Sequence, residues 1–259
     1  MRTIRLTIEY DGTEYVGWQR QAKGRSIQQL VEEALGQIVR EKVVLHSSGR
    51  TDAGVHARAM IAHFRTENTF PLTAFREGAN RFLPNDIAIK EVAEETDDFH
   101  ARFSAGSKWY RYSIYNAPVR SPAFTRTSWH IRQNIDFDAM QGAAGAFVGV
   151  HDFVAFRTNN CDAKTTQREI YSLDLQRDGD LITIDIRGSG FLRHMVRIIV
   201  GTLIEIGWHK RPAEDISRLL TGVSGLRAGV NAPPQGLCLM EVYYSEEPRE
   251  RLTKRETTE

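Results

Sequence analysis

Cysteine is scarce in this chain of 259 residues, which has only Cys161 and Cys238, far apart and outside any metal-type spacing. This scarcity favours a reduced, cytoplasmic protein without a disulfide framework. Long apolar runs are also missing: no segment approaches the roughly 18 apolar residues that a membrane helix needs, so no membrane association is expected. The N-terminus shows no signal-peptide pattern. Among the eight histidines there is no HxxxH or HExxH pair, and we expect no metal site.

Acidic residues are absent from one long stretch, although the net charge of the whole chain is only +1. Residues 99–135 contain no Asp or Glu, and the compensating acids lie in residues 91–98 and in the C-terminal tail. Basic and aromatic side chains are mixed there, which suits phosphates and unstacked bases. A basic loop region with ordinary core aromatics is an equally good interpretation. The basic residues are Arg102, Lys108, Arg111, Arg120, Arg126 and Arg132.

Periodicity in the first hundred residues predicts a β-α-β-β-α-β order, the ferredoxin-like pattern. Apolar residues alternate along the first strand and then keep helical spacing after Ser26, which with Gln29 resembles a capping box. The expected elements are strands over residues 4–10, 43–46, 60–64 and 87–92, a helix after Ser26, and a helix capped by Thr73.

The second half repeats this order. A hairpin across Asp178-Gly179 and a long apolar helix ending at Gly207, a suitable C-terminal cap, are its clearest signals. The expected elements are strands over residues 109–115, 169–176, 181–186 and 237–244, and helices over residues 136–147, 192–206 and 213–220.

We therefore predict an α+β fold in which two ferredoxin-like units join their sheets side by side around a central RNA-binding cleft. The expected division is an N-terminal unit over residues 1–104, a C-terminal unit over residues 105–245, and a charged, frayed tail over residues 246–259.

The strongest local signal is the segment GRTDAGVHA, residues 49–57, between two expected strands. Its glycines let the backbone turn tightly and approach a ligand closely. Arg50 and Asp52 are two positions apart, so in an extended chain they project to the same side, where the arginine would hold the carboxylate ionised and oriented. For an arbitrary aspartate in such a loop, a structural turn with a surface ion pair is the commoner interpretation.

GRTDAGVHA resembles the catalytic motif of the tRNA pseudouridine synthase A family. Three further segments agree with that family in the right order: YDGTEYVGWQRQ, KWYRYSIYN and GSGFLRHMVRIIVGTL. The resemblance runs from about residue 4 to residue 244 and implies the pseudouridine synthase fold. It also implies an isomerase, an intramolecular transferase, that converts uridine to pseudouridine at positions 38–40 of the tRNA anticodon stem-loop, and a homodimer that grips tRNA.

The resemblance assigns roles to individual residues. It implies Asp52 as the catalytic nucleophile, Arg50 beside it, and Arg197 as the arginine that pairs with the aspartate. Tyr110 would stack on the target base, and Trp109 stands where we expect the family to carry a basic residue more often. We further expect substrate contacts from Arg20, Lys108, Arg111 and Arg193.

Considered without the resemblance, Tyr110 is a strand tyrosine, which is more often packing than catalytic. Arg197 lies four residues after Arg193 on a helix, where arginine pairs usually face solvent.

The reaction of such an isomerase requires few functional groups. The reaction breaks the N-glycosidic bond, turns the uracil and rejoins it through carbon 5, so no redox step occurs and no cofactor is expected. A carboxylate could attack either the base or the ribose. The target must first flip out of its stem, which costs a few kcal/mol that an aromatic platform and a cation could offset.

Two other functions remain open from the residues. A non-catalytic RNA-binding module would explain the basic aromatic stretch, but it gains nothing from Asp52 near phosphates. A hydrolase using Asp52 with His56 lacks any accompanying serine or metal constellation.

Overall fold

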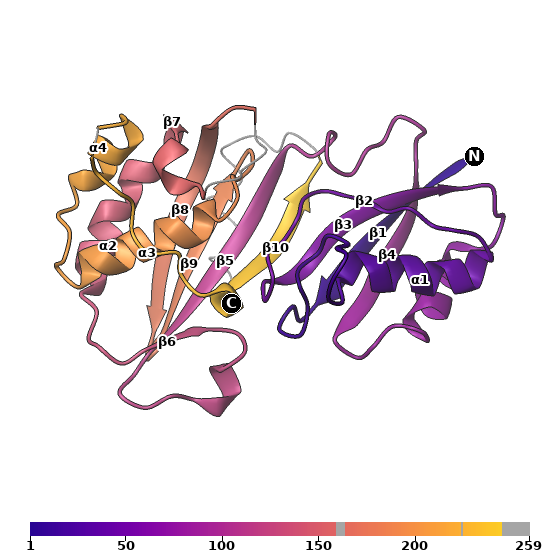
Figure 1. The fold of residues 1–259 in the computed structure, drawn as a ribbon, viewed down its shortest axis with the longest axis horizontal. Helices are drawn as coiled ribbons and strands as arrows, with labels where there is room; N and C mark the ends of the chain where they lie inside the picture. The colour runs from indigo at the N-terminus through magenta and orange to yellow at the C-terminus, as the bar shows by residue number, and fades with distance from the viewer. Residues whose placement is uncertain (159–163, 224, 245–259) are drawn as a thin grey trace, which may run out of the picture.

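The computed structural model describes residues 1–158, 164–223 and 225–244. Its main feature is a ten-stranded sheet with the order β4-β1-β3-β10-β5-β9-β8-β7, to which β2 adds on β3 and β6 on β5. Helices α1 and α3 lie over the same face of this sheet, and the two halves of the molecule extend along its long axis (Figure 1). The α+β class and the side-by-side joining of two sheets are thus confirmed.

The N-terminal half has the strand order β4-β1-β3-β2 with antiparallel neighbours, which is the ferredoxin-like arrangement. Alternate residues of β1 are fully buried because they face the helix layer. The elements are β1 (Arg2–Tyr10), α1 (Ile27–Val39), β2 (His46–Ser47), β3 (His56–Thr66), a π-helical turn (Ala74–Gly78) and β4 (Ile87–Glu95).

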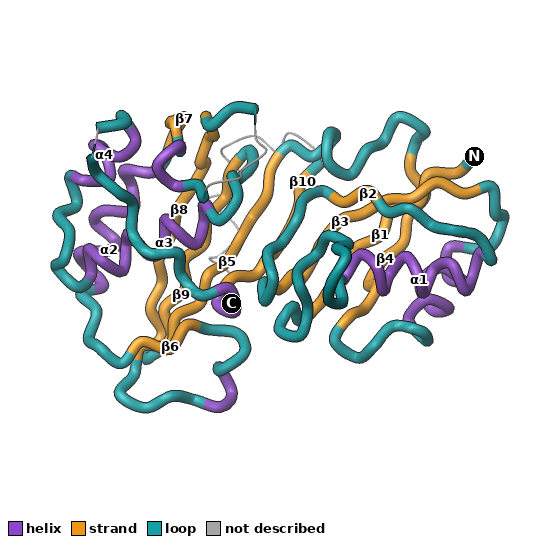
Figure 2. Tube along the Cα trace, viewed as in Figure 1, coloured by secondary structure: helices purple, strands orange, loops and turns teal. Residues whose placement is uncertain are grey.

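The C-terminal half repeats the arrangement as β10-β5-β9-β8, again antiparallel, with β7 added at the edge. Figure 2 shows how long loops alternate with its short helices. The elements are β5 (Ser107–Asn116), β6 (Trp129–Ile131), α2 (Phe137–Ala144), β7 (Gly149–Asp152), β8 (Gln167–Asp178), β9 (Leu181–Gly188), α3 (Met195–Gly207), α4 (Asp215–Leu220) and β10 (Leu237–Tyr243).

The two halves meet along one edge of β3. Near its C-terminal end β3 pairs with β2, through Ala62 and His63, and at its start it pairs in parallel with β10, through His56 and Ala57. The chain between β2 and β3, which carries Asp52, therefore lies at the place where the neighbour of β3 changes from one half to the other.

Two of the expected helix caps are confirmed. The Ser26 hydroxyl accepts the backbone N–H of Gln29 at 3.3 Å, and the Asp136 carboxylate accepts that of Ala139 at 3.0 Å. Each cap satisfies a backbone donor that the first turn of a helix leaves unpaired.

The expected caps at Thr73 and Gly207 are wrong. Thr73 itself has helical angles and caps nothing with its side chain, because the turn begins earlier, at Pro71, whose carbonyl accepts the Ala74 N–H. Gly207 is the last residue of α3, and a Cβ there would lie 2.7 Å from Ile135. This glycine therefore serves close packing, and the left-handed residue is His209, with φ 54°.

The predicted unit boundary between residues 104 and 105 falls between β4 and β5 and stays a prediction, as does an RNA-binding cleft between the sheets. The tail predicted over residues 246–259 lies outside the described residues, as does Cys161. Within the part of the chain that the structure describes, no helix has the length and apolar character needed to cross a membrane.

Candidate active site

The Asp52 loop is held by close backbone contacts with the loop that follows β1. The Trp18 N–H donates to the Thr51 carbonyl at 3.1 Å, and the hydroxyls of Tyr10 and Thr51 share a hydrogen bond of 2.7 Å. Gly17 has φ 102°, and a Cβ there would lie 2.6 Å from the Thr51 carbonyl oxygen. A side chain would push the two loops apart, so glycine is needed for this contact.

His56 ties the same loop to three other segments. Its Nδ1 accepts the Gly12 N–H at 3.1 Å, while its Nε2 lies 2.8 Å from the Arg126 carbonyl and 3.1 Å from that of Gln235. These contacts occupy both ring nitrogens, so His56 holds together the segments that meet at the junction of the halves. The sequence alone left open a hydrolase that would use His56 as a base with Asp52. The observed contacts instead give His56 a structural role.

The Asp52 carboxylate faces two groups from the C-terminal half. Arg197 Nη1 donates to Asp52 Oδ2 at 3.1 Å, and His194 Nε2 lies 3.3 Å from the same oxygen. The Asp52 side chain remains 27% exposed, whereas that of Arg197 is only 10% exposed. The site thus pairs an accessible carboxylate with a buried cation, an arrangement that orients the carboxylate.

Arg197 is fixed by the segment that leads into β10, residues 226–236, here called the strap. Its Nε donates to the Ala232 carbonyl at 2.6 Å, and the Ala232 N–H donates to the Arg197 carbonyl at 3.2 Å. Beside them the Tyr112 hydroxyl donates to the Pro233 carbonyl at 2.8 Å. The strap therefore sets the direction in which the guanidinium points.

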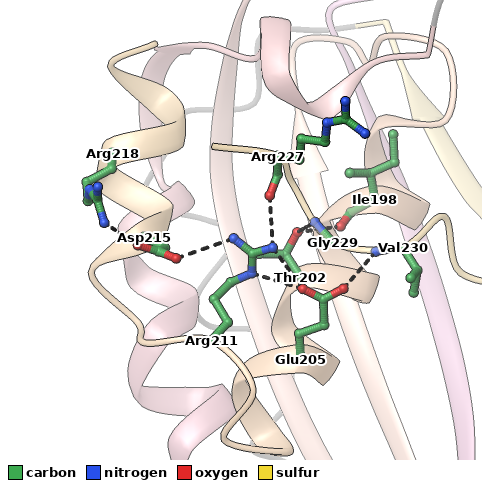
Figure 3. A network of polar contacts seen from close by, with 9 residues as sticks. All are labelled: Ile198, Thr202, Glu205, Arg211, Asp215, Arg218, Arg227, Gly229 and Val230. Carbon is green, nitrogen blue, oxygen red and sulfur yellow. Dashed lines mark hydrogen bonds and ion pairs between the residues drawn. The ribbon is translucent and has the colours of Figure 1, made fainter. Parts of the chain in front are cut away.

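A polar network holds the strap against α3 (Figure 3). Arg211 donates to Glu205 at 2.9 Å and to the Arg227 carbonyl at 2.8 Å, and the Val230 N–H donates to Glu205 at 3.1 Å. The Gly229 N–H donates to the Thr202 hydroxyl at 2.9 Å. Glu205 and Thr202 of α3, together with Arg211 just beyond that helix, thus satisfy backbone groups of the strap, which makes its position well defined.

Small residues allow this contact. A Cβ on Gly201 of α3 would lie 1.8 Å from the Val230 carbonyl oxygen, and a Cβ on Gly229 would lie 2.5 Å from the Thr202 nitrogen. The helix and the strap can approach this closely only because both positions are glycine.

Tyr110 lies on β5 with its side chain on the face that carries Asp52. It is 8% exposed and meets the ring of Phe191 edge-on, with 5.2 Å between centroids. Burial raises the pKa of Tyr110, and the charge of Asp52 adds to the effect. The phenol is therefore neutral near pH 7 and able to donate a hydrogen bond.

Lys108, two residues earlier on β5, donates to the Ser48 carbonyl at 2.8 Å. Burial, with the nearby charges of Arg102 and Arg168, lowers the pKa of Lys108 to about 8. Its ammonium would lie 2.9 Å from a Cβ on Gly49, so it stands directly beside the start of the Asp52 loop.

Arg111 alternates with Tyr110 and lies on the other face of the sheet. It forms a two-point ion pair with Asp185, at 2.8 and 2.9 Å, and its guanidinium lies 5.4 Å from the centre of the Trp109 ring. The Trp109 Nε1–H donates to the same carboxylate at 2.6 Å. Thus the structure separates Arg111 from the Asp52 side of the sheet.

The three remaining arginines predicted for the site have different surroundings. Arg50 is exposed and, among the described residues, forms no ion pair with Asp52; the predicted neighbouring pair is replaced by Arg197 and His194. Arg20 pairs with Glu32 at 3.2 Å, and Arg193 is exposed next to His194.

Sequence reasoning missed His194. Its signal was present, since it lies three residues before Arg197 in HMVR, but a histidine just ahead of a helix gives no periodic cue. The left-handed backbone of His194, φ 64°, brings its ring to Asp52 and becomes visible only in the structure.

A hollow of about 400 Å³ opens beside the Asp52 loop, and both halves contribute to its walls: Thr13, Gly54, Thr125, Arg126, Pro234 and Gln235. Within the described residues no group of three or more His, Cys, Asp or Glu side chains could hold a metal ion.

A duplicated sheet with a carboxylate and a cation at its junction agrees with a known class of enzyme. The sequence model of the family described as tRNA pseudouridine synthase matches residues 6–104 and 143–245. The chain belongs to this family of RNA-modifying isomerases.

Within that family the chain is similar to proteins named tRNA pseudouridine synthase A. It is 56% identical over 245 residues to the one from Syntrophotalea carbinolica, covering 95% of this chain and 97% of the relative. It is 55% identical over 247 residues to the one from Citrifermentans bemidjiense, covering 95% and 99%. Among solved structures, a Cbf5-Nop10-Gar1 complex matches 93% of this chain and 59% of its own at 9% identity and a TM-score of 0.36.

Proposed function

We propose that the protein isomerises uridines at positions 38–40 of the tRNA anticodon stem-loop, with Asp52 as nucleophile after the target base has flipped out. Membership of the tRNA pseudouridine synthases gives the reaction and the class of substrate. The observation that carries the assignment to Asp52 is its accessible carboxylate, held at Oδ2 by buried Arg197 at 3.1 Å.

The reaction needs a nucleophile and a route for one proton. The bond between uracil N1 and ribose C1′ breaks, a bond between C5 and C1′ forms, and the C5 proton leaves as N1 gains one. Asp52 forms a transient bond, with either the base or the ribose, and is released unchanged. Tyr110 supplies an aromatic surface and a neutral hydroxyl beside the carboxylate.

Cations around the loop suit the RNA backbone. Lys108 borders the start of the Asp52 loop, and Arg50 projects from that loop with an exposed side chain. Flipping the target base costs a few kcal/mol, which phosphate contacts and stacking on Tyr110 offset. Arg20 and Arg193 are further candidates, while Arg111 reaches RNA only if the substrate also contacts the opposite face.

The experiment is tritium release from tRNA labelled at uridine carbon 5, with wild type, Asp52→Ala and Asp52→Asn compared. We expect release by the wild type alone and unchanged tRNA binding by both variants. Replacing U38, U39 and U40 one at a time then tests the position. Binding without release by any form would favour an RNA-binding module; full activity of Asp52→Ala would remove Asp52 from the chemistry.

We also propose that the protein acts in the cytoplasm, where tRNA is modified, and as a homodimer that grips one tRNA. Both rest on the similarity of the whole chain to the family. Light scattering of the protein with and without tRNA tests the dimer, and a monomer in both samples would rule it out.

A further inference from the structure

His194 lies directly before α3, between Asp52 and the strap. Its Nε2 is 3.3 Å from Asp52 Oδ2, and its Nδ1 is 3.2 Å from the Asn231 side-chain nitrogen. Its backbone is left-handed, with φ 64° and ψ 2°, which histidine adopts only when its surroundings hold it there. The His194 side chain makes no cap to α3, and with this backbone geometry its ring reaches Asp52.

We propose that His194, set by Asn231, is a positioning residue that binds Asp52 Oδ2 and leaves Oδ1 as the attacking oxygen. The proposal rests on the proposed role of Asp52 as nucleophile. It assigns to His194 a task separate from that of Arg197: the arginine supplies charge, and the histidine fixes which carboxylate oxygen is free.

The proton on the ring follows from its neighbours. An ionised carboxylate only accepts hydrogen bonds, so the Nε2 that faces Asp52 must carry the proton. In the neutral ring Nδ1 then has only a lone pair, and it needs a donor, which the Asn231 amide provides at 3.2 Å. Asn231 therefore selects the tautomer that can bind Asp52.

The two donors make the carboxylate asymmetric. Arg197 Nη1 and His194 Nε2 approach the same oxygen from separate positions before and within α3, at 3.1 and 3.3 Å. Together they hold the plane of the Asp52 carboxylate in one orientation, with one oxygen bound and the other directed away from both donors. Oδ1 accepts no hydrogen bond from the described residues, so it keeps the lone pairs that a nucleophile uses.

The charges around His194 favour its neutral form. Burial lowers the pKa of His194, Asp52 opposes this effect, and Arg197 and Arg193 add to it. When the ring does gain a second proton, Nδ1–H faces the Asn231 amide nitrogen, and the cation draws electron density from the carboxylate. We therefore expect the rate of isomerisation to fall on the acid side as His194 protonates.

Two matched variants separate positioning from structure. His194→Gln places an amide N–H near the position of Nε2 and cannot titrate. His194→Asn tolerates the left-handed backbone equally well, but its side chain is too short to reach Asp52. We expect His194→Asn to lose about 10- to 100-fold in kcat while KM for tRNA stays unchanged. His194→Gln should keep most of the rate and lose the acid-side fall of kcat.

Asn231→Asp gives an independent test. A carboxylate facing Nδ1 stabilises the doubly protonated ring, so the acid-side fall of kcat should move to higher pH. The assay is steady-state tritium release from pH 5 to 8 over a range of tRNA concentrations, which gives kcat and KM, with Asp52→Ala alongside and thermal unfolding of every variant.

Three results would overturn the proposal: a His194→Asn variant as fast as wild type, an unchanged pH profile in His194→Gln, or an equal loss of kcat in His194→Asn and His194→Gln. Activity in Asp52→Ala would instead remove the proposed nucleophile, which is a separate failure.

Discussion

The two halves of the sheet have the same strand order, but they differ in the helices and loops that cover the sheet between their last two main strands. Between its last two main strands the N-terminal half has one short helix, residues 72–80, whose centre, Ala74–Gly78, is π-helical. At the same place the C-terminal half has α3, α4 and the strap, which together form a second layer. The first half contributes Asp52 on a loop held mainly by backbone contacts; the second contributes Arg197 and His194, held by a network of side chains.

This difference shows how two copies of one fold can form a single candidate active site between them. Neither half has both the carboxylate and its partners, since Asp52 comes from one and Arg197 from the other. The shared fold positions the loops, and the candidate site lies in the segments in which the halves diverge.

Arg197→Met should have the largest effect on activity, because it removes the cation that the second half supplies to the Asp52 loop of the first half. Asp52 would lose its 3.1 Å partner and the Ala232 carbonyl would lose a donor. We expect single-turnover tritium release to fall by about 10²- to 10³-fold. Arg76→Met, which removes a 45% exposed arginine outside the network that holds the strap, is the control and should leave the rate unchanged. An Arg197→Met enzyme as fast as this control would contradict the assignment.

Gly201→Ala tests whether the strap sets the site. The added methyl meets the Val230 carbonyl at 1.8 Å, so the strap must move, and we expect about 1–3 kcal/mol less stability together with slower release. Gly142→Ala in α2 is the matched control, because nothing lies within 4 Å of its Cβ. That variant should gain about 0.5–1 kcal/mol in urea unfolding. Equal stability of the two variants would show that the strap is not tightly packed on α3.

His63 makes the N-terminal half sensitive to acid. It is 2% exposed, and burial, with the neighbouring His100 and His46, lowers its pKa to about 4. The unfolded chain binds this proton near its ordinary pKa of 6.5, so stability is present above that pH and is lost as the pH falls toward 4. Between pH 7.5 and 5 the loss should be about 2 kcal/mol.

His63→Asn is the comparison for this slope, since its amide oxygen can still accept the Ala101 N–H that His63 Nδ1 accepts at 3.2 Å. Urea unfolding at each pH should give a shallower slope in the variant. Parallel slopes would mean that another group titrates.

The smallest expected effect tests whether the halves unfold together. Ser26→Ala removes the cap of α1 and Asp136→Ala that of α2, each costing about 1 kcal/mol. Because β3 and β10 join one continuous sheet, both variants should shift the same single transition. Asp136→Asn keeps the capping oxygen and serves as the control. Two separate transitions in calorimetry would show that the joint between the halves is weak.

The sequence predicted the two β-α-β-β-α-β units well, because the alternation of apolar residues in strands and their spacing in helices directly report which residues are buried. The strands expected in each half are present except that the one expected over residues 43–46 is reduced to β2, His46–Ser47, while β3 extends from His56 to Thr66 instead of the short run around residues 60–64. Two short strands, β6 and β7, were not expected, since three or four residues carry too little periodicity to detect.

The site was less predictable. Asp52 and Arg197 were identified through the family motif, and their contact needs the fold, because 145 positions separate them. Spacing suggested Arg50 as the partner of Asp52, but the loop is not an extended strand and its arginine remains exposed. The glycines Gly201 and Gly229 carry no signal of their role until the strap is seen against α3.

The position of β10 has a consequence for synthesis. It is the last strand of the sheet to leave the ribosome, yet it lies between β3 and β5 and joins the two halves. A growing chain would expose the open edge of β3, and Arg197 would lack the strap that fixes it, until β10 has been made. Chains that stop before β10 would keep that edge of β3 unpaired and prone to pair with other chains, so β10 both joins the halves and protects the edge.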